Sequence, residues 1–185
     1  CGQAERAPMC GVPFHSVDSY IARLVSRGYK VAICEQTEDP ATAKGLVKRD
    51  IIRVITPGTV MESSMLDEGR NNYICCMFSE NKKIGLCFCD ISTGELCATE
   101  ISGSDSVNSL TSQLASYNPR EILIGGDIVK IKSLPAFIKS KLSAGVEMLR
   151  DESFDNKLCT DTVNMQFGEE MQCIADSQVL INAIG

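Results

Sequence analysis

Four cationic side chains stand within ten residues of one another in this 185-residue chain: Lys44, Lys48, Arg49 and Arg53. Cations at this density can neutralise the phosphates of a polyanion such as nucleic acid. Residues 1–57 contain 8 Lys and Arg against 6 Asp and Glu, whereas residues 58–185 contain 10 against 18. We therefore expect a polyanion to meet the front section, although an ordinary solvated face would also explain so small a positive excess.

The spacing of the two arginines predicts which of these cations act together. Residues 51–55 (IIRVI) are apolar and β-branched, so they indicate a strand, in which successive side chains point to opposite faces. Arg49 and Arg53 then share one face, and Lys48 lies on the other. We expect only part of the cluster to contact a ligand.

The cations belong to a front section that predicts one helix and two strands. Residues 8–15 (PMCGVPFH) indicate a loop of fixed geometry, because they include two prolines and a glycine. The elements that follow are a helix over 17–27 capped by Ser16 and stopped by Gly28, a strand over 29–36, a short helical turn from Asp39-Pro40 to Gly45, and a strand over 51–55 stopped by Thr56-Pro57-Gly58. So few elements make an incomplete unit, and we expect the rest of its sheet upstream of Cys1, in a longer protein.

The rear section predicts a second unit with a mixed sheet. Its expected elements are strands over 72–79, 84–91 and 95–101, a helix over 107–117, a strand over 121–124, helical residues over 127–142, a strand over 146–150 and, after an irregular stretch, a helix over 169–184. Three strands on short turns make an antiparallel meander, and the two later strands follow helical crossovers. The predicted class is mixed α/β, with the rear section ribonuclease-H-like.

A ribonuclease-H-like fold makes a two-metal nuclease the alternative function. Such a site needs several carboxylates that converge on two Mg²⁺ or Mn²⁺ ions. The first rear strand (NNYICCMFS) has no carboxylate, and the first rear helix has no internal acid. Asp90 and Glu95 flank the Ser-Thr-Gly turn, and we expect them to shape that turn rather than to hold a metal.

Ten cysteines and one histidine do not form a recognisable metal or disulfide pattern. The chain has no C-x-x-C pair, and His15 does not stand at a standard zinc spacing from the cysteines. Most cysteines lie inside apolar runs, as free thiols do in a reducing cytosol. No stretch of 18 apolar residues and no secretory signal occurs, so we expect a cytoplasmic protein without a membrane span.

Several stretches of the chain resemble the MutS family of DNA mismatch-repair proteins. In the front section these are P-M-x-G-V-P-F-H, V-A-I-C-E-Q, D-P-A-x-x-K-G and R-x-I-I-R-V-I-T-P-G-T, and in the rear section D-I-S-T-G-E, N-P-x-E-I-L and Q-F-G. The motif positions that the resemblance marks as structural are Pro8, Met9, Gly11, Pro13, Phe14, His15, Glu35, Asp39, Pro40, Pro57 and Gly58.

The resemblance implies a function for each section. Residues 1–57 would be the C-terminal part of the mismatch-recognition domain, and residues 58–185 the connector domain. In the family a Phe-x-Glu motif wedges an aromatic ring beside the mispaired base. Phe14 is not followed by Glu two residues later, so we expect it to pack, and we expect the four cations to contact the DNA backbone.

The resemblance also implies partners and cofactors. The partners would be mismatched double-stranded DNA, the MutL protein and a second copy of the full-length protein. The family is an ATPase through a C-terminal domain that uses ATP and Mg²⁺. No G-x-x-x-x-G-K-[ST] motif occurs in this chain, so we expect it to be neither an enzyme nor the holder of a cofactor or metal.

Overall fold

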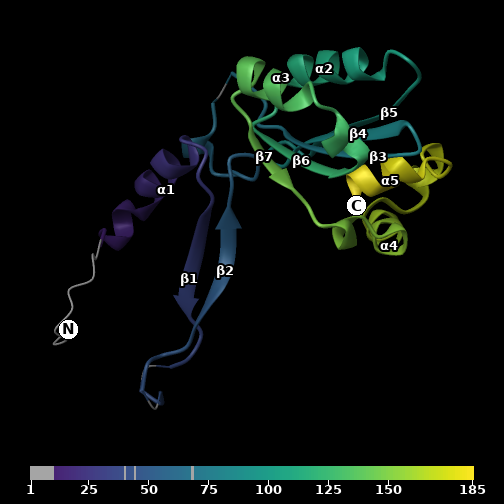
Figure 1. The fold of residues 1–185 in the computed structure, drawn as a ribbon. Coiled ribbons are helices and arrows are strands. Elements are labelled where there is room, and N and C mark those ends of the chain that lie inside the picture. The colour runs from purple at the N-terminus through teal and green to yellow at the C-terminus, as the bar shows by residue number, and fades with distance from the viewer. Residues whose placement is uncertain (1–10, 40, 44, 68) are drawn as a thin grey trace. The chain divides into compact units, whose positions relative to one another are not determined.

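The chain forms two compact units, residues 1–54 and residues 55–185, in a computed structural model (Figure 1). The structure describes residues 11–185 except 40, 44 and 68, and not the side chains of 169–171. The division falls three residues before the boundary expected at 57/58.

The first unit contains a short helix and a two-stranded hairpin. Its elements are a 3₁₀ turn Phe14–Ser16, helix α1 Val17–Val25, and strands β1 Val31–Gln36 and β2 Arg49–Ile55. Helix α1 buries Ile21 and Val25. Helix α1 ends at Val25, two residues earlier than predicted. After it, Gly28 takes a φ of +86° that suits glycine, and the Tyr29 N–H donates a hydrogen bond to the Leu24 carbonyl at 3.1 Å. Ser16 stands at the N-cap position, but its side chain makes no capping hydrogen bond, contrary to the prediction.

The second unit is built on a five-stranded sheet with the strand order β5-β4-β3-β6-β7. The strands are β3 Ile74–Glu80, β4 Lys83–Asp90, β5 Glu95–Ser102, β6 Glu121–Gly126 and β7 Gly145–Met148. Strands β3, β4 and β5 form the antiparallel meander, and β6 and β7 run parallel to β3. This order confirms the mixed α/β prediction and is the one expected for a ribonuclease-H-like domain.

Helices cover both faces of this sheet (Figure 1). Helices α2 Ser106–Tyr117 and α3 Leu134–Lys141 form one layer, and α4 Asn156–Phe167 and α5 Gln178–Ile184 lie on the other side. The main core lies beneath α2 and α3 and includes Met77, Leu86, Leu110 and Ile122, all fully buried. On the α5 side, Gly85 lets the helix approach the sheet, because an added Cβ would lie 1.9 Å from the Val179 carbonyl oxygen.

The last fifth of the chain departs from the prediction. The stretch over 151–168, expected to be irregular, contains α4, whose Asp155 cap accepts a hydrogen bond from the Leu158 N–H at 2.9 Å. The predicted helix over 169–184 is instead a 3₁₀ segment, Gly168–Cys173, followed by α5. Across the described part of the chain, no helix is long and apolar enough to cross a membrane.

Candidate nucleic-acid interface

Three of the four predicted cations, Lys48, Arg49 and Arg53, lie on the β1–β2 hairpin. Among the described residues that connect the two strands, the Asp39 carboxylate accepts a hydrogen bond from the Ala41 N–H at 2.9 Å. The Asp39 carbonyl also accepts from the N–H groups of Thr42 and Ala43. Asp39 therefore caps a single turn that reaches Ala43, in agreement with the predicted helical turn, and the described residues of this segment form no longer helix. Lys44 and Pro40 lie outside the described residues, as do Pro8 and Met9.

Lys48 is engaged within the hairpin itself. Its ammonium group lies 3.2 Å from the Asp50 carboxylate, which also accepts a hydrogen bond from the Thr37 hydroxyl at 3.2 Å. This exposed pair has a small energetic value, on the order of 1 kcal/mol or less. It nevertheless compensates the charge of Lys48 and places that side chain on the same strand face as Asp50.

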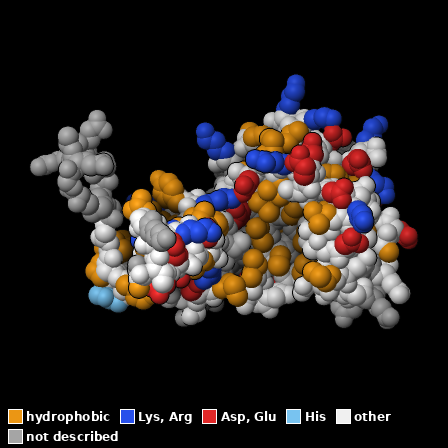
Figure 2. Space-filling model, turned by 90° about the horizontal axis from the view of Figure 1, so that it is seen from below, with side chains coloured by type: hydrophobic (Ala, Val, Ile, Leu, Met, Phe, Trp, Pro, Cys, Tyr) orange, Lys and Arg blue, Asp and Glu red, His pale blue; other side chains and the backbone are white. Residues whose placement is uncertain are grey.

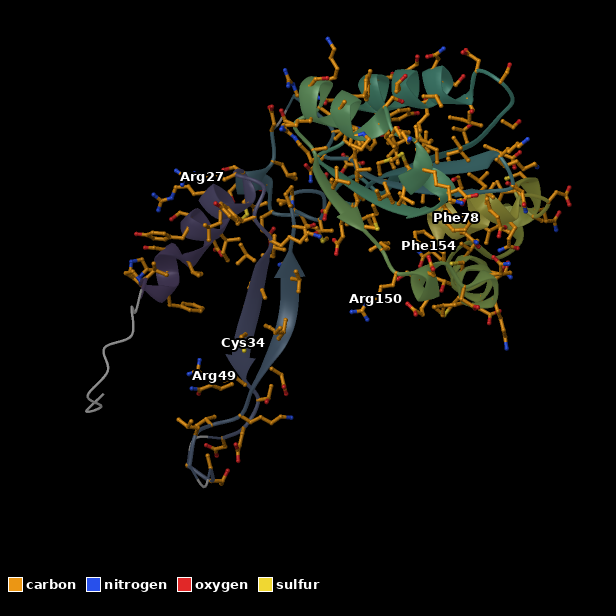
Figure 3. All side chains as sticks on the ribbon, in the orientation of Figure 1. Arg27, Cys34, Arg49, Phe78, Arg150 and Phe154 are labelled. Atoms are coloured by element: carbon orange, nitrogen blue, oxygen red, sulfur yellow. The ribbon has the colours of Figure 1, made fainter. Side chains whose placement is uncertain are left out.

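Arg49 and Arg53 lie on the opposite face of β2. Both are exposed, and the alternation of the strand places Ile51 between them on that face. Figure 3 shows Arg49 at the end of the hairpin where the connecting turn begins, with its side chain directed away from the two strands. One face of β2 therefore presents two arginines separated by an isoleucine.

Several apolar side chains of the first unit are also exposed, on both faces of β2 and on the 3₁₀ turn. Ile51, Ile52 and Val54 of β2 are 64%, 54% and 51% exposed. Phe14 is 91% exposed, so the expectation that it packs is wrong among the described residues: its 3₁₀ turn directs the ring outward, and no described element covers it. Figure 2 shows the pale-blue side chain of the single histidine, His15, at the surface beside hydrophobic side chains. The first unit therefore exposes apolar side chains on both faces of β2.

The other motif residues of the first unit have local structural roles. Pro13 precedes the 3₁₀ turn, and its carbonyl accepts a hydrogen bond from the Ser16 N–H at 2.9 Å. Gly11 has open space around its Cα, and Glu35 is exposed on β1.

The segment after β2 is anchored in the second unit by Glu121, a residue that the sequence reasoning did not single out. Glu121 is 2% exposed, and its carboxylate accepts hydrogen bonds from the Thr56 hydroxyl and, at 3.2 Å, from the Gly58 N–H. An added Cβ at Gly58 would lie 2.9 Å from the Cβ atoms of Glu121 and Ile74. Gly58 thus allows the close approach, and the N-P-x-E motif was the one available signal for Glu121.

A second contact completes this anchor. The Pro57 carbonyl accepts a hydrogen bond from the Asn72 side chain at 3.0 Å. Ile55 and Val60, on either side of the Thr56-Pro57-Gly58 sequence, are buried at 2% and 3% exposure. The chain therefore enters the second unit through a packed and hydrogen-bonded segment.

Asp90 and Glu95 stabilise the β4–β5 turn and its surroundings, as expected. Asp90 accepts hydrogen bonds from the Ser92 hydroxyl at 2.6 Å and from the Asn72 and Ser92 N–H groups at 2.9 Å. Burial alone would raise the pKa of Asp90, but these hydrogen bonds to the ionised form lower it below its usual value. Glu95 accepts from Asn71 and from the Tyr73 hydroxyl. Among the described residues, no three His, Cys, Asp or Glu side chains are grouped so that they could hold a metal ion.

The cysteines of the described residues are free thiols. Burial raises the pKa of Cys76 and that of Cys87 to about 12, which keeps both protonated at neutral pH. Cys34, on β1, and Cys173 are exposed.

The comparisons with known proteins agree with this architecture. Residues 1–64 match the family model described as MutS domain I, and residues 72–185 match that described as MutS domain II. The chain belongs to the MutS family.

The individual relatives are DNA mismatch repair proteins MutS from several bacteria. The chain is 44% identical over 185 residues to the DNA mismatch repair protein MutS of Acetivibrio thermocellus, covering 100% of this chain and 21% of that protein. It is 44% identical over 185 residues to that of Ruminiclostridium cellulolyticum, with the same coverage, and 46% identical over 154 residues to that of Clostridium tetani, covering 83% of this chain and 17% of that protein. The chain thus spans about a fifth of the length of the curated relatives it matches.

Proposed function

We propose that this chain is the part of a DNA mismatch-repair protein that contacts the backbone of mismatched duplex DNA through its first unit. The observation that carries the proposal is the exposed face of β2 with Arg49 and Arg53 on either side of Ile51. Arginines on a strand can bind two phosphates, and the apolar side chain between them can lie against sugars in a groove. Such contacts position the protein and carry no sequence information, which suits a protein that must bind a mispair in any sequence context.

The second unit, in this proposal, connects the DNA-binding end to the rest of the protein and offers surface to the MutL protein. Its 18 Asp and Glu against 10 Lys and Arg over residues 58–185 favour a protein-facing role for most of its surface. A homodimer of the full-length protein and a cytoplasmic location belong to the same proposal, and the free buried thiols support the latter.

The nucleotide chemistry of the family belongs elsewhere in the protein. The residues of this chain do not fit ATP and Mg²⁺, because the sequence has no phosphate-binding G-x-x-x-x-G-K-[ST] motif. We therefore propose that the 185 residues are not themselves catalytic.

The test uses the full-length protein that carries these residues. Arg49→Ala with Arg53→Ala should weaken binding to a duplex with one mispair, measured by fluorescence anisotropy across a salt series. Each phosphate that the protein no longer neutralises reduces the slope of log K against log salt by about 0.9, so the double variant should lose about 1.8. Arg150→Ala with Lys157→Ala, which removes two exposed charges from the second unit, is the matched control and should keep the wild-type slope. An unchanged slope in the Arg49/Arg53 variant would overturn the proposal.

A further inference from the structure

The second unit carries an acidic net charge, but its charges are not evenly distributed. Helix α2 (SVNSLTSQLASY) has no charged residue, and residues 128–146 contain four lysines and no Asp or Glu. Asp105 and Asp127 lie where α2 and the segment leading to α3 begin. Asp127 is moreover paired with Lys130.

The topology brings three cations together at the other end of the layer. Strands β6 and β7 are parallel neighbours that start at Glu121 and Gly145, and the Gly145 N–H donates to the Arg120 carbonyl at 3.0 Å. Helices α2 and α3 both end just before these strands start, so their C-terminal ends lie at the end of the sheet where β6 and β7 begin. We call the three cations there, Arg120, Lys139 and Lys141, the cationic edge. All three side chains are exposed.

Two acids where β6 and β7 start point to the other face of the sheet, whereas Glu95, which accepts a hydrogen bond from the Tyr73 hydroxyl, lies on the α2 side near Tyr117. Ile122 and Ile124 pack in the core beneath α2 and α3, so their neighbour Glu121 lies on the α5 face, where it holds Thr56 and Gly58. Glu147 is the register partner of Leu123 and therefore also lies on that face. No ion pair between described residues involves the three cations of the cationic edge. Figure 3 shows nitrogen-tipped side chains projecting outward from α3.

The composition of the layer distinguishes between the ligands that a cationic surface can bind. Helices α2 and α3, whose side chains are all described, expose serine, asparagine and lysine but no large hydrophobic residue. Protein interfaces are centred on aromatic and apolar anchors and are depleted in lysine. Lysine together with hydroxyl and amide groups is instead what contacts phosphate and sugar oxygens.

The position of the cationic edge within the fold supports the same ligand. Arg120 directly precedes Glu121, the residue that anchors Thr56 and Gly58, and these follow β2 in the chain. The cations thus stand at the edge of the second unit where the chain arrives from the proposed DNA-binding hairpin.

We propose that the cationic edge is a second DNA-backbone contact, which binds phosphates of duplex flanking the mispair. This inference rests on the proposed function, because it requires that the full-length protein binds DNA. Lys139 and Lys141 also stand in the last turn of α3, and Arg120 shortly after α2, where a cation stabilises the helix dipole. That role affects the melting temperature and not the dependence of DNA binding on salt, so the two roles can be separated.

The experiment compares three variants of the full-length protein on one mispaired duplex across a salt series. The first is Arg120→Gln with Lys139→Gln and Lys141→Gln. The second, a charge-matched control, replaces Lys82, Arg150 and Lys157 of the same unit with glutamine; all three are exposed. The third is the Arg49/Arg53 variant described above, and each variant is also melted to verify that it is folded.

The cationic-edge variant should lose between about 1 and 2.7 of the slope of log K against log salt, the value for one to three phosphates, while the control keeps the wild-type slope. A wild-type slope in a folded cationic-edge variant, with or without a lower melting temperature, overturns the inference. If only the Arg49/Arg53 variant then loses slope, the proposed function stands without the second contact. If neither variant loses slope, both proposals fail. Should the triple variant not fold, Lys139→Glu alone gives the same two outcomes, with a loss of at least about 0.9 expected.

Discussion

Replacement of Glu121 by alanine should destabilise the second unit and release the segment that links it to β2. The Glu121 carboxylate is buried, and it accepts hydrogen bonds from the Thr56 hydroxyl and from the Gly58 N–H. The Thr56 hydroxyl has a second partner, the Thr59 hydroxyl at 2.9 Å, whereas no other described group is an acceptor for the Gly58 N–H. The two donors therefore differ in what they lose.

The loss in free energy of unfolding can be estimated from these hydrogen-bond partners. A buried donor left without an acceptor costs about 1–3 kcal/mol, and this applies in full to the Gly58 N–H. The Thr56 hydroxyl loses one of two partners, which adds about 1 kcal/mol. The expected loss in free energy of unfolding is thus about 2–4 kcal/mol. Glu121→Gln keeps an acceptor oxygen in place and should lose less than half as much.

Urea unfolding of the 185-residue chain, followed by circular dichroism, measures these losses. Glu152→Ala, which removes an exposed carboxylate from the same unit, serves as the control and should change the free energy of unfolding by less than about 0.5 kcal/mol. The reasoning is refuted if Glu121→Ala is as stable as Glu152→Ala, or if the glutamine variant is as unstable as the alanine variant.

Three further predictions concern the second unit. Gly85→Ala should cost on the order of 3 kcal/mol in a melting experiment, because its Cβ would collide with the Val179 backbone and push α5 from β4. Gly145→Ala, with no atom within 4 Å of its added Cβ and no positive φ, should cost clearly less. Because the pKa of Asp90 is lowered, its carboxylate stabilises the fold above the ordinary aspartate pKa, and this stabilisation is lost as the pH falls through the folded-state pKa. Asp90→Asn should therefore make the free energy of unfolding fall less steeply at acidic pH. An unchanged dependence on pH would contradict the hydrogen-bond account. At pH 8 iodoacetamide should label the exposed Cys34 and Cys173 and leave the buried Cys76 and Cys87 unmodified in the folded chain, as mass spectrometry can show; equal labelling would mean that these two thiols are not buried.

The sheet of the second unit could be predicted because its signals are local. Strands β3, β4 and β5 are apolar runs separated by tight turns, and Asn81 and Lys82 take the positive φ values that such a turn requires. Helix α4 was missed because its sequence, NKLCTDTVNMQF, buries few side chains, with Cys159 and Val163 the fully buried ones. The amphipathic periodicity of α4 is therefore weak, and Asp155 at the N-cap position was the only sequence signal for this helix.

The candidate interface also has one feature that the sequence predicts and others that depend on the fold. The shared face of Arg49 and Arg53 follows from alternation along one strand, so the sequence alone predicted it. Glu121 could not be predicted as the anchor of Thr56 and Gly58, because they are 65 and 63 residues away in sequence and meet only when β6 is in place. The exposure of Phe14 was also beyond local rules, since whether an aromatic ring packs depends on which elements surround it.

The most direct test of the proposed DNA contact uses the exposed thiol of Cys34, which lies on the strand next to that of Arg49 (Figure 3). A duplex with one mispair and a thiol tether on a neighbouring phosphate is incubated with the full-length protein under conditions of disulfide exchange. If the hairpin contacts the DNA backbone beside the mispair, a protein–DNA disulfide should form. This cross-link should persist in Cys173→Ser and be absent in Cys34→Ser. A cross-link that fails to form, or that survives in Cys34→Ser, would contradict the placement of this hairpin on DNA.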